Sequence, residues 1–399
     1  MGDIAAERVT GILRDRRLVV LLTVQFLAGV AAAPVLALLP IYVDEQLALG
    51  QDFTANARAI WLLFMGIFAL AGGVLSDAAG RKLTIIIGLI GSMAGATVFV
   101  LDSPLMIGLV IPVVLGAADG LFVTASQAYL MEASPKNRLA LMTGLWFSGF
   151  TVGNAVGGLA GGAVAEWAGF GALALYVAIA TGVVALIALL ALPSPEPSSQ
   201  IARPSFRVAA AGYGHLLRQK SVQLLVAIQI LRTFFWGGFP IMGPVLVDAL
   251  SDSKFVVGAF VAATAGIGLA SMLIVGWHSD RRGRKLPVFA SLAGTAIGAA
   301  LIGLLLGNIV GLFLAGAAAA AFAWALSGQM TPLAKELTGP GESGRAMGLV
   351  NGAWSLSAIG GAQIGGRMVS AHASEAFFIF AALALIALVC GVALFRRPQ

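Results

Sequence analysis

Two charged residues stand inside long apolar stretches of this chain, where a charge needs a chemical reason. Asp119 lies near the middle of one such stretch and Arg232 near the middle of another. A carboxylate in apolar surroundings can carry a proton, and a guanidinium can bind the acidic group of a small molecule. The two side chains could instead form a static ion pair that joins two parts of the molecule. The sequence leaves these three interpretations open.

Side chains that could contact a bound molecule lie on the same expected helices as the two charges. They are mostly aromatic rings and amides, and they include Gln229 and Trp236 near Arg232 and Phe122 and Ser126 after Asp119. Such a set, with few hydrogen-bonding groups, suits a lipophilic or amphipathic solute better than a sugar.

A charged turn occurs twice in the chain. The segment GVLSDAAGRKL, from Gly73 to Leu83, returns as GWHSDRRGRKL from Gly276 to Leu286, with seven identical positions at an offset of 203 residues. The identical residues that could do chemistry are Gly73, Ser76, Asp77, Gly80, Arg81 and Lys82 in the first copy, and Gly276, Ser279, Asp280, Gly283, Arg284 and Lys285 in the second. The chain is therefore predicted to contain two copies of one structural unit.

The composition predicts that helices crossing a membrane position these residues. Hydrophobic residues make up 59% of the chain and charged residues 11%, whereas soluble domains have about 25% charged residues. Runs long enough to span a bilayer lie at about 18–43, 56–75, 84–101, 105–130, 139–164, 170–192, 222–247, 255–275, 287–306, 309–333, 346–369 and 376–395. A segment rich in proline and serine, 193–221, separates six runs from the next six.

The distribution of basic residues predicts the orientation. With a cytoplasmic N-terminus, 20 of the 24 Lys and Arg residues fall in cytoplasmic segments, so we expect both termini inside a multi-pass plasma (inner) membrane protein. The basic residues lie in short clusters between apolar runs, where they meet the anionic lipids of the inner leaflet, and this pattern excludes nucleic acid as a partner. With one cysteine, Cys390, and no metal-ligand cluster, neither a metal nor a cofactor is expected.

The pattern G-x-x-x-D-x-x-G-R-K, between the second and third runs and again between the eighth and ninth, resembles the signature of the major facilitator superfamily. The resemblance implies an all-α membrane protein with twelve transmembrane helices in two pseudo-symmetric six-helix bundles, acting as a monomer by alternating access. It also implies a central cavity lined by the first, fourth, seventh and tenth helices, so that Gln25 on the first helix and Trp324 and Gln329 on the tenth join the residues expected to contact the bound molecule. The expected parts are an N-terminal segment (1–17), the two bundles (18–192 and 222–395), the linker between them (193–221) and a tail (396–399). The repeated turn would then be a conformational latch, with Asp77 as its acid and Asp280 as the counterpart.

A row of glycines in the fifth run, Gly149, Gly153, Gly157 and Gly158, is similar to a motif of proton-driven drug exporters in that superfamily. Asn154 stands where that motif has a proline. The resemblance implies a secondary transporter that exports lipophilic or amphipathic small molecules and uses Asp119 for proton coupling. The alternative is a proton-linked carrier of an organic anion that Arg232 binds. Helix packing alone would also explain the glycine spacing.

An enzyme is not expected. His215, His278 and His372 all lie at or beyond the membrane edges, and no Ser/His/Asp or metal-ligand grouping occurs. The sequence therefore predicts transport of a small molecule without chemical conversion.

Overall fold

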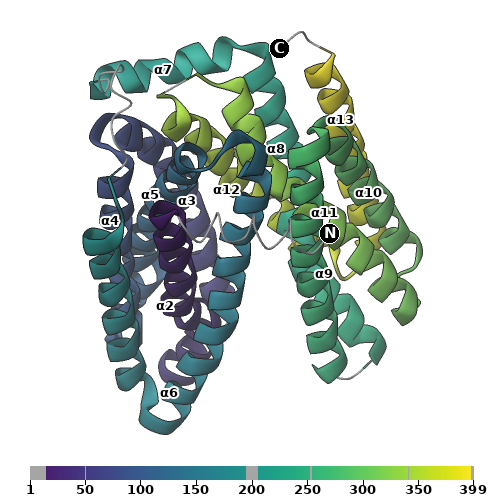
Figure 1. Cartoon of the computed structure of the whole chain (residues 1–399). Coiled ribbons are helices and arrows are strands. Elements are labelled where there is room, and N and C mark those ends of the chain that lie inside the picture. Colours follow the sequence, from purple (N-terminus) through teal and green to yellow (C-terminus); the bar gives the residue numbers. More distant parts are fainter. Residues whose placement is uncertain (1–14, 50, 195–204, 252–253, 340, 397–399) are drawn as a thin grey trace, which may run out of the picture. The chain divides into compact units, whose positions relative to one another are not determined.

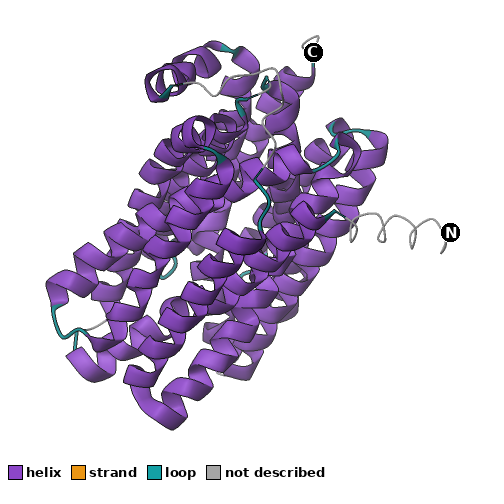
Figure 2. Ribbon diagram, turned by 60° about the vertical axis from the view of Figure 1, so that its left-hand side comes forward, coloured by secondary structure: helices purple, strands orange, loops and turns teal. Residues whose placement is uncertain are grey.

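The computed structural model describes residues 15–49, 51–194, 205–251, 254–339 and 341–396, and these residues form helices and the short segments between them (Figure 2). Most of the expected N-terminal segment, part of the linker and most of the tail lie outside the described residues. The α-helices are α2 (Arg16–Leu47), α3 (Gln51–Ala79), α4 (Arg81–Ser92), α5 (Ile111–Ala133), α6 (Leu139–Ala191), α7 (Phe206–Arg218), α8 (Lys220–Ser251), α9 (Lys254–Arg282), α10 (Lys285–Leu304), α11 (Ile309–Leu337), α12 (Ser343–Met368) and α13 (Ala373–Phe395) (Figure 1). Shorter helical turns are η1 (Met93–Val100), η2 (Met106–Val110) and η3 (Lys136–Arg138).

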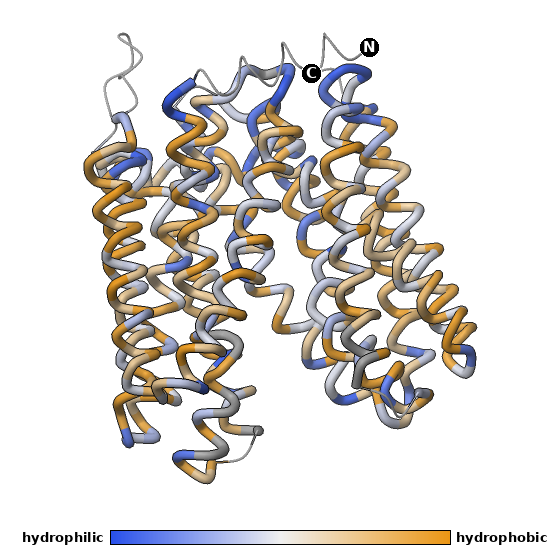
Figure 3. The backbone as a smooth tube through the Cα atoms, turned by 60° about the horizontal axis from the view of Figure 1, so that its bottom comes forward, coloured by the Kyte–Doolittle hydropathy of each residue, from blue (hydrophilic) through white to orange (hydrophobic). Residues whose placement is uncertain are grey.

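The prediction of an all-α membrane protein is confirmed. In the described residues, ten helices are long and apolar enough to cross a membrane. Figure 3 shows the reason, because hydrophobic residues cover most of the helix lengths while hydrophilic residues gather at helix ends and turns. A backbone in lipid must satisfy its own hydrogen bonds, and a helix does so within one segment.

The helices do not correspond one to one with the predicted spans. Helix α6 has 53 residues, about 80 Å at the normal rise, and contains two predicted spans. Its backbone breaks at Gly169, where φ is 77°. Figure 1 shows that α6 turns back on itself. Conversely, α7 is a 13-residue helix inside the predicted linker and is too short to cross a bilayer. Helix α12 covers the eleventh predicted span but is not among the ten helices that are long and apolar enough to cross a membrane.

The helices form two compact units. Unit 1 consists of Met1–Ser134, Leu145–Gly212 and Pro340–Gly352, and unit 2 of Pro135–Gly144, Tyr213–Gly339 and Ala353–Gln399. The start of α6 thus belongs to unit 2, and the start of α12 belongs to unit 1. Each unit therefore contains one helix start from the opposite half of the sequence.

Each unit has its own apolar core. In unit 1 the ring of Tyr42 lies edge-on to Phe170 at 5.0 Å, within a cluster of buried aliphatic side chains. In unit 2 Phe235 stacks on Phe239 at 5.0 Å, and Phe380 packs beside them. Trp236 and Trp324, described below, pack against the unit 2 cluster.

The first helix shows how local sequence fixes a helix start. The carboxylate of Asp15 accepts a hydrogen bond from the backbone N–H of Arg17 at 3.0 Å, which caps α2. The Arg17 side chain also donates to this carboxylate and holds the pKa of Asp15 below its ordinary value.

Candidate functional site

The first copy of the repeated turn folds around a buried arginine. Gly80 separates α3 from α4 with φ at 104°, a conformation that glycine adopts without strain. The next residue, Arg81, then points back into unit 1. Its guanidinium donates to Glu132 at 2.7 Å and to Ser76 at 3.2 Å, and it lies 2.7 Å from the carboxylate of Asp77. The glycine thus sets the direction in which the arginine enters the helix interface.

The second copy builds the same network in unit 2. Gly283 has φ at 92°, and Arg284 follows it. The Arg284 guanidinium donates to Glu336 at 3.0 Å and to Ser279 at 3.1 Å, and it lies 2.6 Å from Asp280. The sequence repeat is therefore also a repeat of side-chain geometry.

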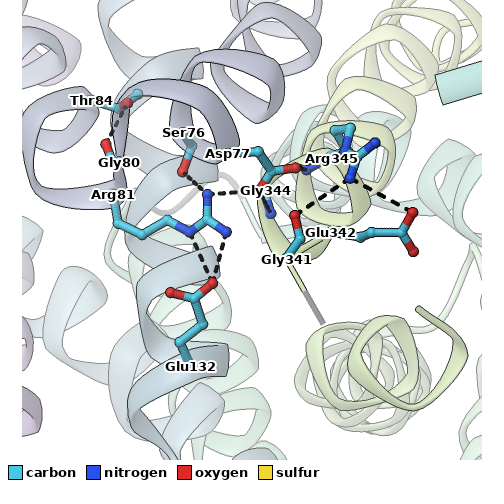
Figure 4. Close-up of polar contacts among 10 residues, drawn as sticks. All are labelled: Ser76, Asp77, Gly80, Arg81, Thr84, Glu132, Gly341, Glu342, Gly344 and Arg345. Atoms are coloured by element: carbon cyan, nitrogen blue, oxygen red, sulfur yellow. Dashed lines mark hydrogen bonds and ion pairs between the residues drawn. The ribbon is translucent and has the colours of Figure 1, made fainter. Parts of the chain in front are cut away.

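In unit 1, Asp77 holds the first turn of α12. Its carboxylate accepts hydrogen bonds from the backbone N–H groups of Gly344 at 2.9 Å and Arg345 at 3.1 Å, and from the Arg345 side chain at 2.8 Å (Figure 4). These backbone groups have no partner within their own helix, and they carry the positive end of its dipole. A side chain at position 344 would not fit, because a Cβ there would lie 2.6 Å from both Asp77 Oδ1 and the carbonyl oxygen of Gly73.

In unit 2, Asp280 holds the first turn of α6 in the same way. Its carboxylate accepts from the backbone N–H groups of Ala140 at 3.1 Å and Leu141 at 2.9 Å. In both units the bound groups belong to the second and third residues of a helix. Gly276 lies at this contact, since a Cβ there would be 3.0 Å from the carbonyl oxygen of Ala140. Each repeated aspartate therefore binds the N-terminus of one helix.

Three members of these networks were not expected from the sequence. Glu132 and Glu336 neutralise the two buried arginines, and Arg345 adds a charged contact to Asp77. The two glutamates follow the repeated turns at nearly equal distances along the chain, which is a signal that a search for repeats could have found. Arg345 has no such signal, because it meets Asp77 only through the fold.

The lysines that follow the two buried arginines, Lys82 and Lys285, lie outside these networks. Lys82 is partly exposed, and the ammonium group of Lys285 lies 6.0 Å from the centre of the Phe289 ring. Among the described residues, no three His, Cys, Asp or Glu side chains come together as a metal site would require.

Asp119 lies between helices of unit 1. Its half-buried carboxylate accepts a hydrogen bond from the indole N–H of Trp61 on α3 at 2.9 Å. A longer contact of 3.5 Å joins it to the hydroxyl of Ser92 at the end of α4. Both of these partners are uncharged, so no cation among them fixes the carboxylate in its ionised form.

The other expected contact residues of unit 1 occupy separate places. Phe122 is buried against α4, where a Cβ at Gly88 would come within 2.8 Å of it. Ser126 donates to the carbonyl oxygen of Val123 at 3.1 Å. Gln25 is 1% exposed, and its side-chain oxygen has no hydrogen-bond partner in the described part of the chain. The structure thus does not bring these three side chains to Asp119.

A further polar contact of unit 1 links the start of α12 to α5. The side-chain amide of Asn351 donates to Gln127 at 2.9 Å and to Thr124 at 3.3 Å, and all three residues are buried. Asn351 is six residues beyond Arg345 on the same helix, so the start of α12 is held at two levels. No sequence pattern predicted this contact.

Arg232 is buried in unit 2, between α8 and α11. Its guanidinium donates to Gln229 at 2.7 Å and to the hydroxyl of Ser327 at 2.8 Å. One helical turn away, the rings of Trp236 and Trp324 meet edge-on at 5.0 Å. The structure therefore brings together Arg232, Gln229 and both tryptophans from the predicted set, and it adds Ser327.

Gln329, on α11, is hydrogen-bonded to the second copy of the repeated turn. Its side-chain oxygen accepts from Ser279 at 2.5 Å, while its amide nitrogen has no partner among the described residues. Since Gln329 and Ser327 are two residues apart on α11, they point to nearly opposite sides of that helix. The helix that supports Arg232 is thus also bonded to the repeated turn.

The glycine row of α6 is a packing surface against α2. A Cβ at Gly153 would overlap the carbonyl oxygen of Phe26, and a Cβ at Gly157 would overlap that of Val30. Gly149 allows ordinary contact at 3.6 Å, and nothing lies near Gly158. Two of the four glycines therefore permit a close approach of helix backbones.

Solved structures of transporters share this fold over almost the whole chain. The human organic anion transporter TETRAN is 17% identical, with 94% of this chain and 99% of that chain covered and a TM-score of 0.79. A bacterial homologue of the iron transporter ferroportin, in an outward-facing state, is 14% identical, with 95% and 99% covered and a TM-score of 0.78. The proton:xylose symporter XylE, bound to 6-bromo-6-deoxy-D-glucose, is 16% identical, with 94% of each chain covered and a TM-score of 0.74. At these identities the likeness establishes the fold alone.

Sequence comparison gives a family match. No curated protein matches the chain. A sequence model described as Major Facilitator Superfamily matches residues 21–333, which is more than three quarters of the 399 residues. The matched range includes both repeated turns, Asp119 and Arg232.

Proposed function

Because this chain belongs to the Major Facilitator Superfamily, and is a multi-pass membrane transporter rather than an enzyme, we propose that it is a proton-driven secondary transporter. It exports lipophilic or amphipathic small molecules across the plasma (inner) membrane by alternating access, with both termini in the cytoplasm. Protons moving down their gradient drive the export.

The observation that carries this proposal is the environment of Asp119. A charge inside a membrane is costly and is kept for a function. The hydrogen bond from Trp61 fixes the position of the carboxylate but does not neutralise it. Binding of a proton removes the charge, and release restores it, so Asp119 can couple proton movement to a change of helix packing between α3, α4 and α5.

The two repeated turns serve as the conformational latch. Asp77 and Asp280 each bind the N-terminus of a helix that comes from the opposite half of the sequence. Closing a latch satisfies backbone N–H groups that have no partner in their own helix, and opening it exposes those groups to water. Both arrangements can therefore be populated during a transport cycle, as alternating access requires.

The basic side chains Lys82 and Lys285 follow the two turns and meet anionic lipid phosphates of the inner leaflet. The chain acts as a monomer, since each of its two units contributes one copy of the turn. The close contact of α6 with α2 at Gly153 and Gly157 keeps these two helices together as one rigid pair.

The test uses purified protein in proteoliposomes with an imposed pH gradient and a pH-sensitive dye inside. A panel of amphipathic anions, cations and neutral compounds is added to the wild type and to Asp119→Asn. We expect at least one compound to dissipate the gradient in the wild type but not in the variant. Asp102→Asn is the matched control, because Asp102 is exposed and its loss removes the same charge. Equal proton movement in the wild type and Asp119→Asn would refute the assignment of Asp119.

A further inference from the structure

Arg232 is a buried cation whose hydrogen-bond partners are neutral. The residue is 5% exposed and lies near the middle of α8. Its Nε donates to the side-chain oxygen of Gln229, and Nη1 donates to Ser327. The third nitrogen, Nη2, has no partner in the described part of the chain. A guanidinium carries five N–H groups, so most of its donor capacity is unused.

The acidic residues described in unit 2 do not neutralise this charge. Asp280 and Glu336 both bind Arg284. Glu375 contacts His372, and Asp248 lies 16 residues further along α8, about 24 Å away at the normal rise. The two other buried arginines of the repeated turns each have two carboxylates, so Arg232 differs from them in lacking an anion.

The unused edge of the guanidinium has the geometry that an acidic group needs. Nη2 keeps both of its N–H groups and Nη1 keeps one, and the N–H groups of a guanidinium bind the oxygens of a carboxylate or sulfonate through charge-assisted hydrogen bonds. Gln229 and Ser327 occupy one hydrogen each and hold the plane of the group in place. The site is therefore already oriented before an anion arrives.

Two tryptophans lie one turn from this edge. Trp236 is four residues after Arg232 on α8, and Trp324 is three residues before Ser327 on α11, so each shares a helix face with its polar neighbour. The indole N–H of Trp236 donates to the backbone of Ala323 at 3.4 Å, which fixes that ring. Both rings are half-buried and offer flat apolar surface about 6 Å along the helix axes from the charge.

We propose that Arg232 binds the acidic group of the transported molecule and that Trp236 and Trp324 contact its flat apolar part. The substrate class is thus an amphipathic organic anion, a carboxylate or sulfonate on an aromatic or similar body. This assignment rests on the proposed function, because it takes the bound molecule to be the transported one. It also excludes lipophilic cations, which a buried guanidinium repels.

A matched ligand series tests the proposal without any gradient. Purified protein in nanodiscs of zwitterionic lipid is titrated with 2-naphthoate, 2-naphthalenesulfonate, 2-naphthalenemethanol and 2-naphthylmethylammonium by calorimetry. These probes share one apolar body and differ in charge. We expect the two anions to bind at least tenfold more tightly than the alcohol, and the ammonium to bind most weakly. Tightest binding of the ammonium or the alcohol would overturn the proposal.

Variants then locate the site. Arg232→Gln keeps an amide donor but removes the charge, and we expect it to weaken anion binding at least tenfold, or about 1.4 kcal/mol. Arg232→Lys keeps the charge but loses the paired N–H groups, so we expect an intermediate loss. Arg367→Gln removes an exposed charge from the same unit and should bind like the wild type. Unchanged binding in folded Arg232→Gln protein would contradict the assignment.

Two further readouts separate the remaining explanations. If sodium chloride at millimolar concentration displaces 2-naphthoate, the site holds an inorganic anion and the proposal fails. If Asp119→Asn abolishes gradient-driven transport while 2-naphthoate binding persists, both the coupling role and the anion site are supported. Binding of 2-naphthoate without any gradient-driven movement in the wild type would refute the proposed function and leave the anion site intact.

Discussion

The bond between Asp77 and the first turn of α12 gives a prediction with a calculable size. Asp77→Asn keeps the shape of the side chain but removes its charge. The NH2 group of the new amide also faces backbone N–H groups of α12, with which it cannot form a hydrogen bond. The carboxylate has two backbone donors and contacts two arginines, and its side chain is fully buried. Removing one partner of a buried ion pair costs about 3–5 kcal/mol. The population with α12 bound to the turn should therefore fall at least a hundredfold relative to the released one, since about 1.4 kcal/mol corresponds to a factor of ten.

Thiol labelling measures this population. Met347 lies two residues beyond Arg345 and is 1% exposed. In a Cys390→Ser background, a cysteine introduced by Met347→Cys reacts with a maleimide only when the start of α12 leaves its site. We expect the labelling rate to rise at least about a hundredfold in Asp77→Asn, in proportion to the released population as long as that population stays minor. Asp102→Asn, which removes an exposed carboxylate, should leave the rate within about twofold.

A steric variant tests the same contact without changing charge. A Cβ at Gly344 would lie 2.6 Å from the Asp77 carboxylate, so Gly344→Ala should also accelerate labelling. Asp280→Asn should have the smaller effect on its own contact, because Asp280 binds no arginine from the helix that it holds. If both Asp77→Asn and Gly344→Ala fold and label at the wild-type rate, the turn does not hold α12 and the latch assignment is wrong.

Three other predictions concern stability, each read as the midpoint of thermal unfolding in detergent. Gly157→Ala should lower the free energy of unfolding by about 1–3 kcal/mol, because the added methyl group overpacks α6 against α2. Gly158→Ala, which has open space around it, should lower it by less than about 0.5 kcal/mol. Equal unfolding midpoints for the two variants would show that close packing at Gly157 does not matter. Gly283→Ala meets no atom within 4 Å, so its expected loss of about 1–2 kcal/mol comes from the backbone at φ 92° alone, and no loss would show that the turn relaxes. Since Arg17 lowers the pKa of Asp15, the wild type should exceed Asp15→Asn in stability at pH 7 and lose that advantage below about pH 4; an advantage that grows on acidification would contradict this.

The sequence predicted part of the candidate site. Asp77 and Asp280 were identified because the two turns are alike, and the structure gives them equivalent networks. Their helix partners were not predicted, since Gly344 is 267 residues from Asp77 and no local pattern marks which helix start will be bound. Gln329 was expected among the substrate contacts, but it bonds to Ser279, because burial on α11 makes its amide seek the nearest polar group.

For the two intramembrane charges, too, the sequence identified the residues but not their partners. Their cost in lipid made Asp119 and Arg232 conspicuous in the sequence, yet the sequence left open whether they pair. The fold surrounds each with its own neutral partners, which come from helices adjacent in space. Trp61 had no reason to be selected before those helices were placed.

By itself, the sequence determined the membrane-spanning helices, the duplication and the two charged turns. These features depend on local rules, because an apolar segment in lipid must close its own backbone hydrogen bonds, and glycine takes the positive φ that starts α4. Only the tertiary structure decided which helix N-terminus each aspartate binds, which glycines of α6 touch α2, and that Arg232 has no carboxylate partner among the described residues. Those contacts join residues far apart in the chain, and their energies depend on the packing of whole helices rather than on any segment alone.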